Sequence, residues 1–178
     1  MKNILKMKKS ELESWLKSNP ANLKKLYTEE YINKVNWKNI PIDFVNEHSD
    51  LVDWFQISAY QKLSEEFIKR HSKLVNWYWI SSCQKLSEEF IERYAGSVDW
   101  TRVSTYQKLS EEFIEKHSDL VNWGWISEYQ KLSEAFIEKH SDKVNWNRIS
   151  EYQKFSEAFI EKHSDKVNWN CISKYQKL

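Results

Sequence analysis

The chain has 178 residues, of which 27 are Lys or Arg and 26 are Asp or Glu, so its formal net charge is +1 at pH 7. This balance gives no electrostatic push towards nucleic acid or an anionic membrane. Aromatic residues make up 15% of the chain against only two Gly and two Pro, which argues against a turn-rich β array and favours helices. Because no apolar stretch approaches the roughly 20 residues that span a bilayer, we expect a soluble cytoplasmic protein.

The first part of the chain differs from the rest. The string SELE at 10–13 is a capping box, and it opens a predicted helix that Pro20 ends. We interpret residues 1–27 as an N-terminal helical cap that covers the end of a repeat array at residues 28–178. The early copies in this array are irregular, and one shortened copy has Pro41 near the start of its second helix.

The rest of the chain is one phrase of 23 residues written repeatedly. The copies at 117–139 and 140–162 differ at only four positions. The repeat tryptophans follow the same period: Trp54, Trp77, Trp100, Trp123, Trp146 and Trp169. A fixed period of this size is typical of arrays in which each copy buries its apolar face against its neighbours. The sequence therefore predicts an all-α fold, an α-solenoid of short two-helix repeats.

The first helix of each repeat is expected to follow an Asn or Asp whose side chain accepts hydrogen bonds from the first turn. These residues are Asn36, Asp53, Asn76, Asp99, Asn122, Asn145 and Asn168. In one copy, Trp146 and Ile149 then face the core together with Gln153 or Tyr152. Arg148 is expected on the surface, so that Arg148→Ala changes stability by no more than about 0.5 kcal/mol.

The second helix of each repeat is expected to start at a serine, because acidic residues follow at once and suit the positive end of a helix. These serines are Ser64, Ser87, Ser110, Ser133 and Ser156. Ile137 and His140 are predicted to face inward. The helix is predicted to stop near Ser141 with Asp142 in a left-handed turn, and Gly96 occupies the matching position in its own repeat.

The string W-x-x-I-S-x-Y-Q-K-L-S-E-x-F-I resembles a short helical repeat of uncharacterised proteins from giant viruses and bacteriophages. The resemblance covers about residues 28–178. It implies an α-solenoid fold and a virus-associated origin, and it brings no catalytic residues and no assigned activity. Cys83, which stands where other copies have Tyr, departs from the pattern.

Two patterns resemble sites of chemistry. His-Ser-Asp recurs, but consecutive helical residues point about 100° apart and cannot converge as a catalytic triad. The five histidines share one repeat position and are expected roughly 8–10 Å apart, too far for joint zinc binding, so we interpret them as half-buried structural residues. We predict no enzyme, no cofactor and no metal site. Cys83 and Cys171 belong to no spaced pair and predict no disulfide.

A lysine row recurs at Lys62, Lys85, Lys108, Lys131, Lys154 and Lys177. Such a row can follow the backbone of a nucleic acid. We interpret it instead as a solvated row whose charge is balanced by a glutamate row three residues later. That glutamate row consists of Glu65, Glu88, Glu111, Glu134 and Glu157.

The copies differ mainly at the second, third and sixth positions of the first helix, which we call the variable strip. The second and sixth positions are four apart and share a helix face, and the third lies beside them. Large aromatic residues and Arg on an exposed face are typical binding anchors. The predicted binding residues are Phe55, Tyr78, Trp79, Arg102, Trp125 and Arg148. The open alternative is that Trp79 and Trp125 belong to the core.

The sequence therefore favours a monomeric, non-enzymatic scaffold that binds a protein or peptide through the variable strip. In the viral setting that the resemblance implies, the partner would be a host factor, including a defence protein that the scaffold inhibits. The alternative partner is single-stranded nucleic acid. Trp79, Arg102, Trp125 and Arg148 alternate on successive repeats, and aromatic and Arg side chains can each stack on a base.

Overall fold

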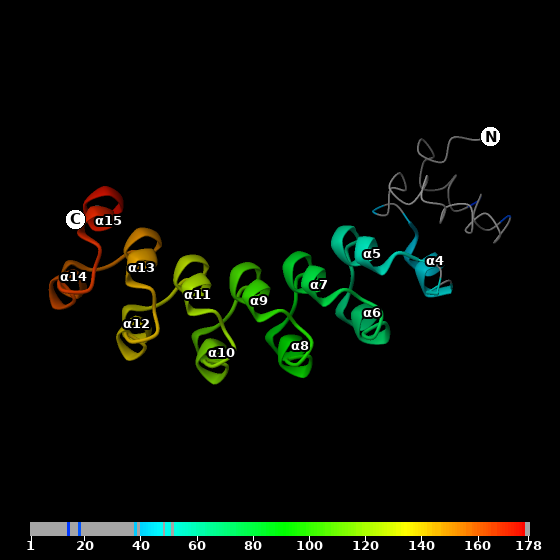
Figure 1. Cartoon of the computed structure of the whole chain (residues 1–178), viewed down its shortest axis with the longest axis horizontal. Coiled ribbons are helices and arrows are strands. Elements are labelled where there is room, and N and C mark those ends of the chain that lie inside the picture. The colour runs from blue at the N-terminus through cyan, green and yellow to red at the C-terminus, as the bar shows by residue number, and fades with distance from the viewer. Residues whose placement is uncertain are drawn as a thin grey trace. The chain divides into compact units, whose positions relative to one another are not determined.

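The computed structural model describes residues 14, 18, 38, 40–47, 49–50 and 52–176. Within this part of the chain, the regular structure is twelve helices and no strand, which confirms the predicted all-α repeat fold (Figure 1). Apart from positions 14 and 18, the predicted N-terminal cap of residues 1–27 lies outside the described residues. The predicted helix start at Asn36 and the end of the lysine row at Lys177 lie outside them as well.

The helices belong to two compact units, Met1–Cys83 (unit 1) and Gln84–Leu178 (unit 2). Unit 1 contains the second helices α4 (Ile42–Glu47) and α6 (Glu65–Arg70) and the first helices α5 (Trp54–Tyr60) and α7 (Trp77–Cys83). In unit 2 the second helices are α8 (Glu88–Arg93), α10 (Glu111–Lys116), α12 (Glu134–Lys139) and α14 (Glu157–Lys162). The first helices of unit 2 are α9 (Trp100–Tyr106), α11 (Trp123–Tyr129), α13 (Trp146–Tyr152) and α15 (Trp169–Tyr175). In unit 2 the first helices pack side by side as one layer, and the second helices form the other layer (Figure 1).

The predicted helix starts are confirmed wherever the chain is described. The Asn145 side chain accepts a hydrogen bond from the Arg148 backbone N–H at 3.2 Å. Ser133 Oγ accepts from the Phe136 N–H at 3.2 Å. Each bond satisfies a first-turn donor that has no partner inside its own helix. In the shortened copy Pro41 directly precedes α4, where a missing N–H costs nothing.

The predicted left-handed end of the second helix is wrong. Helix α12 ends at Lys139, and its C-cap His140 has φ −111° and ψ 32°. Among the described residues no backbone has a positive φ, glycines included. The chain continues through right-handed turns, in which the His140 carbonyl accepts from the Val144 N–H at 3.1 Å. Because these turns satisfy the last carbonyls, neither Asp142 nor Gly96 has to adopt a left-handed conformation.

The core consists of branched aliphatic and phenylalanine side chains from both helices of each repeat. Ile137 and Ile149 are completely buried, and Phe136 is 5% exposed. The repeat tryptophans are half-buried, except for Trp169, which is 52% exposed, and Trp146 packs against the edge of the core rather than inside it. The Trp146 ring stands 5.1 Å from the His163 ring between centroids, and its Nε1–H donates to the Ser141 carbonyl at 2.9 Å. The four described histidines, His71, His117, His140 and His163, each pack against a repeat tryptophan, and His71, His140 and His163 are buried rather than half-buried as predicted.

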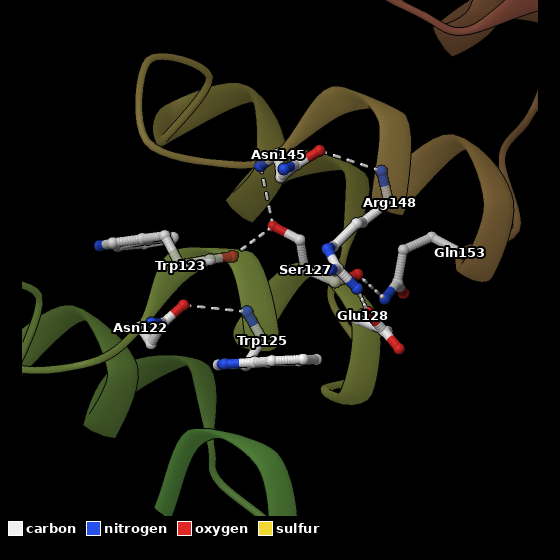
Figure 2. A network of polar contacts seen from close by, with 8 residues as sticks. All are labelled: Asn122, Trp123, Trp125, Ser127, Glu128, Asn145, Arg148 and Gln153. Carbon is white, nitrogen blue, oxygen red and sulfur yellow. Dashed lines mark hydrogen bonds and ion pairs between the residues drawn. The ribbon is translucent and has the colours of Figure 1, made fainter. Parts of the chain in front are cut away.

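Buried polar side chains connect consecutive repeats of unit 2. Gln153 Nε2 donates to the Gln130 carbonyl at 2.6 Å, and its Oε1 accepts from the Leu132 N–H at 3.2 Å. Ser127 Oγ donates to the Trp123 carbonyl and accepts from the Asn145 N–H at 2.9 Å (Figure 2). The residue on the core side is therefore Gln153, whereas Tyr152 is 52% exposed. Because these bonds satisfy backbone groups of the preceding repeat, they set how each first helix lies on the one before it.

Candidate binding surface

In unit 1 the variable strip forms an aromatic cluster. Phe55 on α5 is 48% exposed, and Tyr78 on α7 is 40% exposed. Trp79, which is partly buried, contacts both rings edge-on, with centroid distances of 5.5 Å to Phe55 and 5.0 Å to Tyr78. Edge-to-face contacts of this kind hold aromatic rings in fixed orientations. The three residues predicted for this part of the strip therefore lie together.

Neither α5 nor α7 contains a charged residue. A partner that covers their outer face therefore has no ion to desolvate on these two helices, and desolvation is the main cost of burying a charged side chain. Trp79 is partly buried, which lies between the two alternatives that the sequence left open for it. Trp79 supports Phe55 and Tyr78 from beside them, and its Nε1 is buried without a hydrogen-bond partner. The exposed aromatic side chains of this cluster are thus Phe55 and Tyr78.

In unit 2 the variable strip is more polar. The Arg148 guanidinium lies over the Trp125 ring, 4.8 Å from its centroid, and pairs with the Glu128 carboxylate (Figure 2). Trp125 also packs against Tyr129, with a centroid distance of 5.8 Å. Arg148 is therefore more than a free surface side chain, because it shields Glu128, whose side chain is only 9% exposed. Trp125 is partly buried beneath this pair.

Arg102 contacts a tyrosine of its own helix. Its guanidinium stands over the Tyr106 ring of the same helix, 5.9 Å from the centroid. The six predicted site residues therefore form an aromatic set in unit 1 and a mixed set in unit 2. Within unit 2, Trp125 and Arg148 contact each other, and Arg102 contacts a tyrosine that the prediction did not include.

A row of exposed tyrosines was missed by the sequence reasoning. They are Tyr60, Tyr106, Tyr129, Tyr152 and Tyr175, with 58%, 56%, 52%, 52% and 47% of each residue exposed. We call them the tyrosine row. They were overlooked because positions that stay constant between copies were interpreted as core. The signal was present, since each tyrosine is four residues after the third helix position and so belongs to the same outer face.

Three members of the glutamate row form hydrogen bonds with serines of the next repeat. Glu111 Oε2 accepts from Ser133 Oγ of the next repeat at 3.0 Å, and its Oε1 accepts from the Ser133 N–H. The same pair of bonds joins Glu88 to Ser110, and Glu134 to Ser156. These carboxylates thus support the N-cap of the following second helix.

Ion pairs between repeats are formed instead by a second set of side chains on the second helices. Lys116 pairs with Glu92, Lys139 with Glu115, and Lys162 with Glu138. The hydrogen bond from Lys139 lowers the pKa of the Glu115 carboxyl below its usual value, and the nearby charges of Lys139 and His140 act in the same direction. These pairs are exposed, so each contributes little to stability.

The other chemical groups form no recognisable centre within the described residues. No group of three or more His, Cys, Asp or Glu is placed there to hold a metal ion. Burial, with the neighbouring charge of Arg70, lowers the pKa of His71. Cys83 is exposed and Cys171 is half-buried, and both are free thiols. No helix in the described part of the chain is long and apolar enough to cross a membrane.

Comparison of the chain with models of protein families, with curated proteins and with solved structures gave no match. The resemblance to a viral and bacteriophage repeat therefore stays an expectation from the sequence. A function for this chain is therefore inferred from the geometry of its helices and side chains.

Proposed function

We propose that the chain is a non-enzymatic scaffold whose first helices bind a protein or peptide partner. The observation that carries the proposal is the aromatic cluster of unit 1. Phe55 and Tyr78 are 48% and 40% exposed on neighbouring first helices that hold no charged residue. Exposed aromatic residues gathered on one face favour a binding surface over neutral variation.

The cluster is suited to binding in two further ways. Because Trp79 contacts Phe55 and Tyr78 edge-on, the two exposed rings are already oriented, and less side-chain freedom is lost when a partner covers them. An aromatic anchor buried at the centre of an interface can contribute about 2 kcal/mol or more. The partner chemistry that fits best is an apolar segment, such as the hydrophobic face of a helix.

A viral origin, which the sequence resemblance implies, would make a host protein the natural partner, with inhibition of a defence factor as the outcome. Reading of single-stranded nucleic acid by the alternating Trp and Arg residues of the variable strip is less well supported. Arg148 is paired with Glu128 and stacked on Trp125, so its charge is already compensated.

The proposal is tested by quantitative capture from host lysate with the full-length chain and two variants. Phe55→Ser with Tyr78→Ser removes the exposed anchors. Leu74→Ser is the matched control, because Leu74 is 46% exposed in unit 1 but lies in the turn between α6 and α7. We expect one set of proteins to be captured by the natural chain and by the control and lost with the double variant. Equal capture by all three proteins would refute the proposal.

A further inference from the structure

Charge is divided between the two layers of unit 2. Among its described residues, the first helices and the linkers after them hold seven basic residues and two acidic ones, namely Lys85, Arg102, Lys108, Lys131, Arg148, Lys154 and Lys174 against Glu128 and Glu151. The second helices hold four basic residues and ten acidic ones, namely Arg93, Lys116, Lys139 and Lys162 against Glu88, Glu89, Glu92, Glu111, Glu112, Glu115, Glu134, Glu138, Glu157 and Glu161. The turns that lead back to the first helices add Asp99, Asp119, Asp142 and Asp165 against Lys143 and Lys166, so the excess of basic residues is confined to the first helices and the linkers after them.

The linker lysines of three repeats of unit 2 take no part in the ion pairs of its described residues. Lys108, Lys131 and Lys154 are exposed, and none of them forms an ion pair with the described part of the chain. The glutamates nearest in sequence bond to serine hydroxyl and N–H groups instead, as Glu111 does with Ser133. The positive charge of the row is thus available to an anionic partner.

Each of these three lysines follows a tyrosine of the tyrosine row by two residues. In the first full repeat of unit 2, Gln107 is the C-cap of α9 and has extended backbone, with φ −90° and ψ 152°. Gln107 is buried, whereas its two neighbours, Tyr106 and Lys108, are both exposed. Helix α9 ends at Tyr106, so the tyrosine and the lysine two residues later are both accessible at the same end of this first helix. The next two repeats have the same arrangement, with extended C-caps at Gln130 and Gln153.

We propose that this tyrosine–lysine face binds single-stranded nucleic acid without sequence preference. The face consists of Tyr106, Tyr129 and Tyr152 with Lys108, Lys131 and Lys154. Each repeat offers one exposed tyrosine ring and one ammonium group for a phosphate. Because Tyr106 also contacts Arg102 and Tyr129 also contacts Trp125, a base would stack on the part of the ring that stays exposed. This combination of aromatic platforms and positive charge is the general solution for binding single strands. Because every base has a flat face, the binding does not depend on sequence.

Two other anionic partners fit this face less well. An acidic peptide would satisfy the lysines but would leave the tyrosine rings without flat groups to stack on. Duplex DNA offers phosphates, but its bases are already stacked inside the helix. The face is in unit 2 and carries positive charge, so it is independent of the uncharged aromatic cluster in unit 1 that supports the protein-binding proposal.

The experiment measures fluorescence anisotropy of a labelled oligothymidylate of about 15 nucleotides with the full-length chain over a range of salt concentrations. Lys108, Lys131 and Lys154 are replaced together by Ala. The matched control replaces Lys116, Lys139 and Lys162 by Ala, which removes the same charge from the same three repeats but from the other layer. With three phosphates contacted, the plot of log affinity against log salt should have a slope of about −2.

We expect the first lysine variant to bind weakly with a nearly flat salt dependence and the control variant to bind like the natural chain. Equal weakening in both variants would refute a dedicated face. In a second pair of variants the three tyrosines are replaced together by Phe or by Ala. Phe should preserve binding, and Ala should weaken it by at least about fivefold for each ring that carries a base.

Circular dichroism of every variant checks that the helices are retained, which is expected because all replaced side chains are exposed. Binding that is insensitive to Tyr→Ala, or equal binding of a labelled oligoglutamate of matched charge, would overturn the nucleic-acid proposal in favour of a simple polyanion surface. Absence of any salt-dependent binding of the oligothymidylate would also overturn it. None of these results bears on Phe55 and Tyr78, so the two proposals fail separately.

Discussion

Replacing Arg148 by Ala is a sharp test of the packing between repeats, because sequence and structure predict different results. From the sequence, Arg148 is a surface residue whose loss should change the free energy of unfolding by at most about 0.5 kcal/mol. In the structure its guanidinium pairs with Glu128 and covers Trp125. The Glu128 side chain is 9% exposed and that of Arg148 is 37% exposed, so removing Arg148 leaves a nearly buried carboxylate unpaired.

The loss of stability expected for Arg148→Ala lies between two known limits. Breaking an ion pair on the surface costs about 0–1 kcal/mol, and breaking a fully buried pair by removing one partner costs about 3–5 kcal/mol. Since Glu128 is nearly buried and Arg148 is not, we expect a loss of about 2 kcal/mol for Arg148→Ala. About 0.5–1 kcal/mol of this comes from the lost contact with the Trp125 ring.

Urea denaturation followed by circular dichroism measures these effects as a double-mutant cycle. Glu128→Gln removes the negative charge, so Arg148→Ala should cost much less in that background, and the coupling energy should be about 1–2 kcal/mol. A cost for Arg148→Ala below about 0.5 kcal/mol, or the same cost in both backgrounds, would show that the ion pair does not stabilise the fold.

Three further predictions follow from burial, backbone conformation and pKa. Ile137→Ala should lower the free energy of unfolding by about 2–5 kcal/mol, and Tyr152→Ala should change it by no more than about 0.5 kcal/mol. If denaturation experiments gave similar losses for both variants, the tyrosine row would not be exposed. Gly96→Ala should raise the free energy of unfolding by about 0.4–1 kcal/mol, because Gly96 has no positive φ and a Cβ there meets no atom within 4 Å. A drop in thermal stability would instead indicate a left-handed turn at Gly96. Because Lys139 lowers the pKa of Glu115 in the folded state, the contribution of Glu115 is fully present above its usual pKa of 4.5 and is lost as the pH falls through the lowered value. Denaturation of Glu115→Gln as a function of pH should therefore show a smaller loss of stability below pH 4.5, and an unchanged profile would count against the pair.

The sequence was sufficient for the fold because every local signal in a repeat points to the same structure. The cap residues Asn145 and Ser133 could be located from the residues that follow them, and the structure confirms both. The end of the second helix was predicted wrongly at Asp142. The start of the second helix has a cap residue that the sequence shows. The end of the helix depends on turns that any residue can adopt, so the sequence contains no local marker for that end.

The candidate surface was only partly predictable. Variation between copies located Phe55 and Tyr78, which are exposed, and Arg148, which proved to be paired. Constancy was a poor guide to burial, since the constant Tyr152 is exposed and the adjacent constant Gln153 is buried. Gln153 is constant because its side chain satisfies backbone groups of the preceding repeat, and bonds between repeats cannot be inferred from the spacing within one repeat.

The most direct test of the central claim is the affinity of a captured partner for the natural chain and for the variant with both Phe55→Ser and Tyr78→Ser, measured by isothermal calorimetry. If each ring contributes about 1 kcal/mol or more, the double variant should bind at least about thirtyfold more weakly. The heat-capacity change on binding should be negative for the natural chain and smaller in magnitude for the variant, because less apolar surface is buried. Leu74→Ser should bind like the natural chain. Equal affinity of the double variant and the natural chain would contradict the claim that the aromatic cluster of unit 1 is the binding surface.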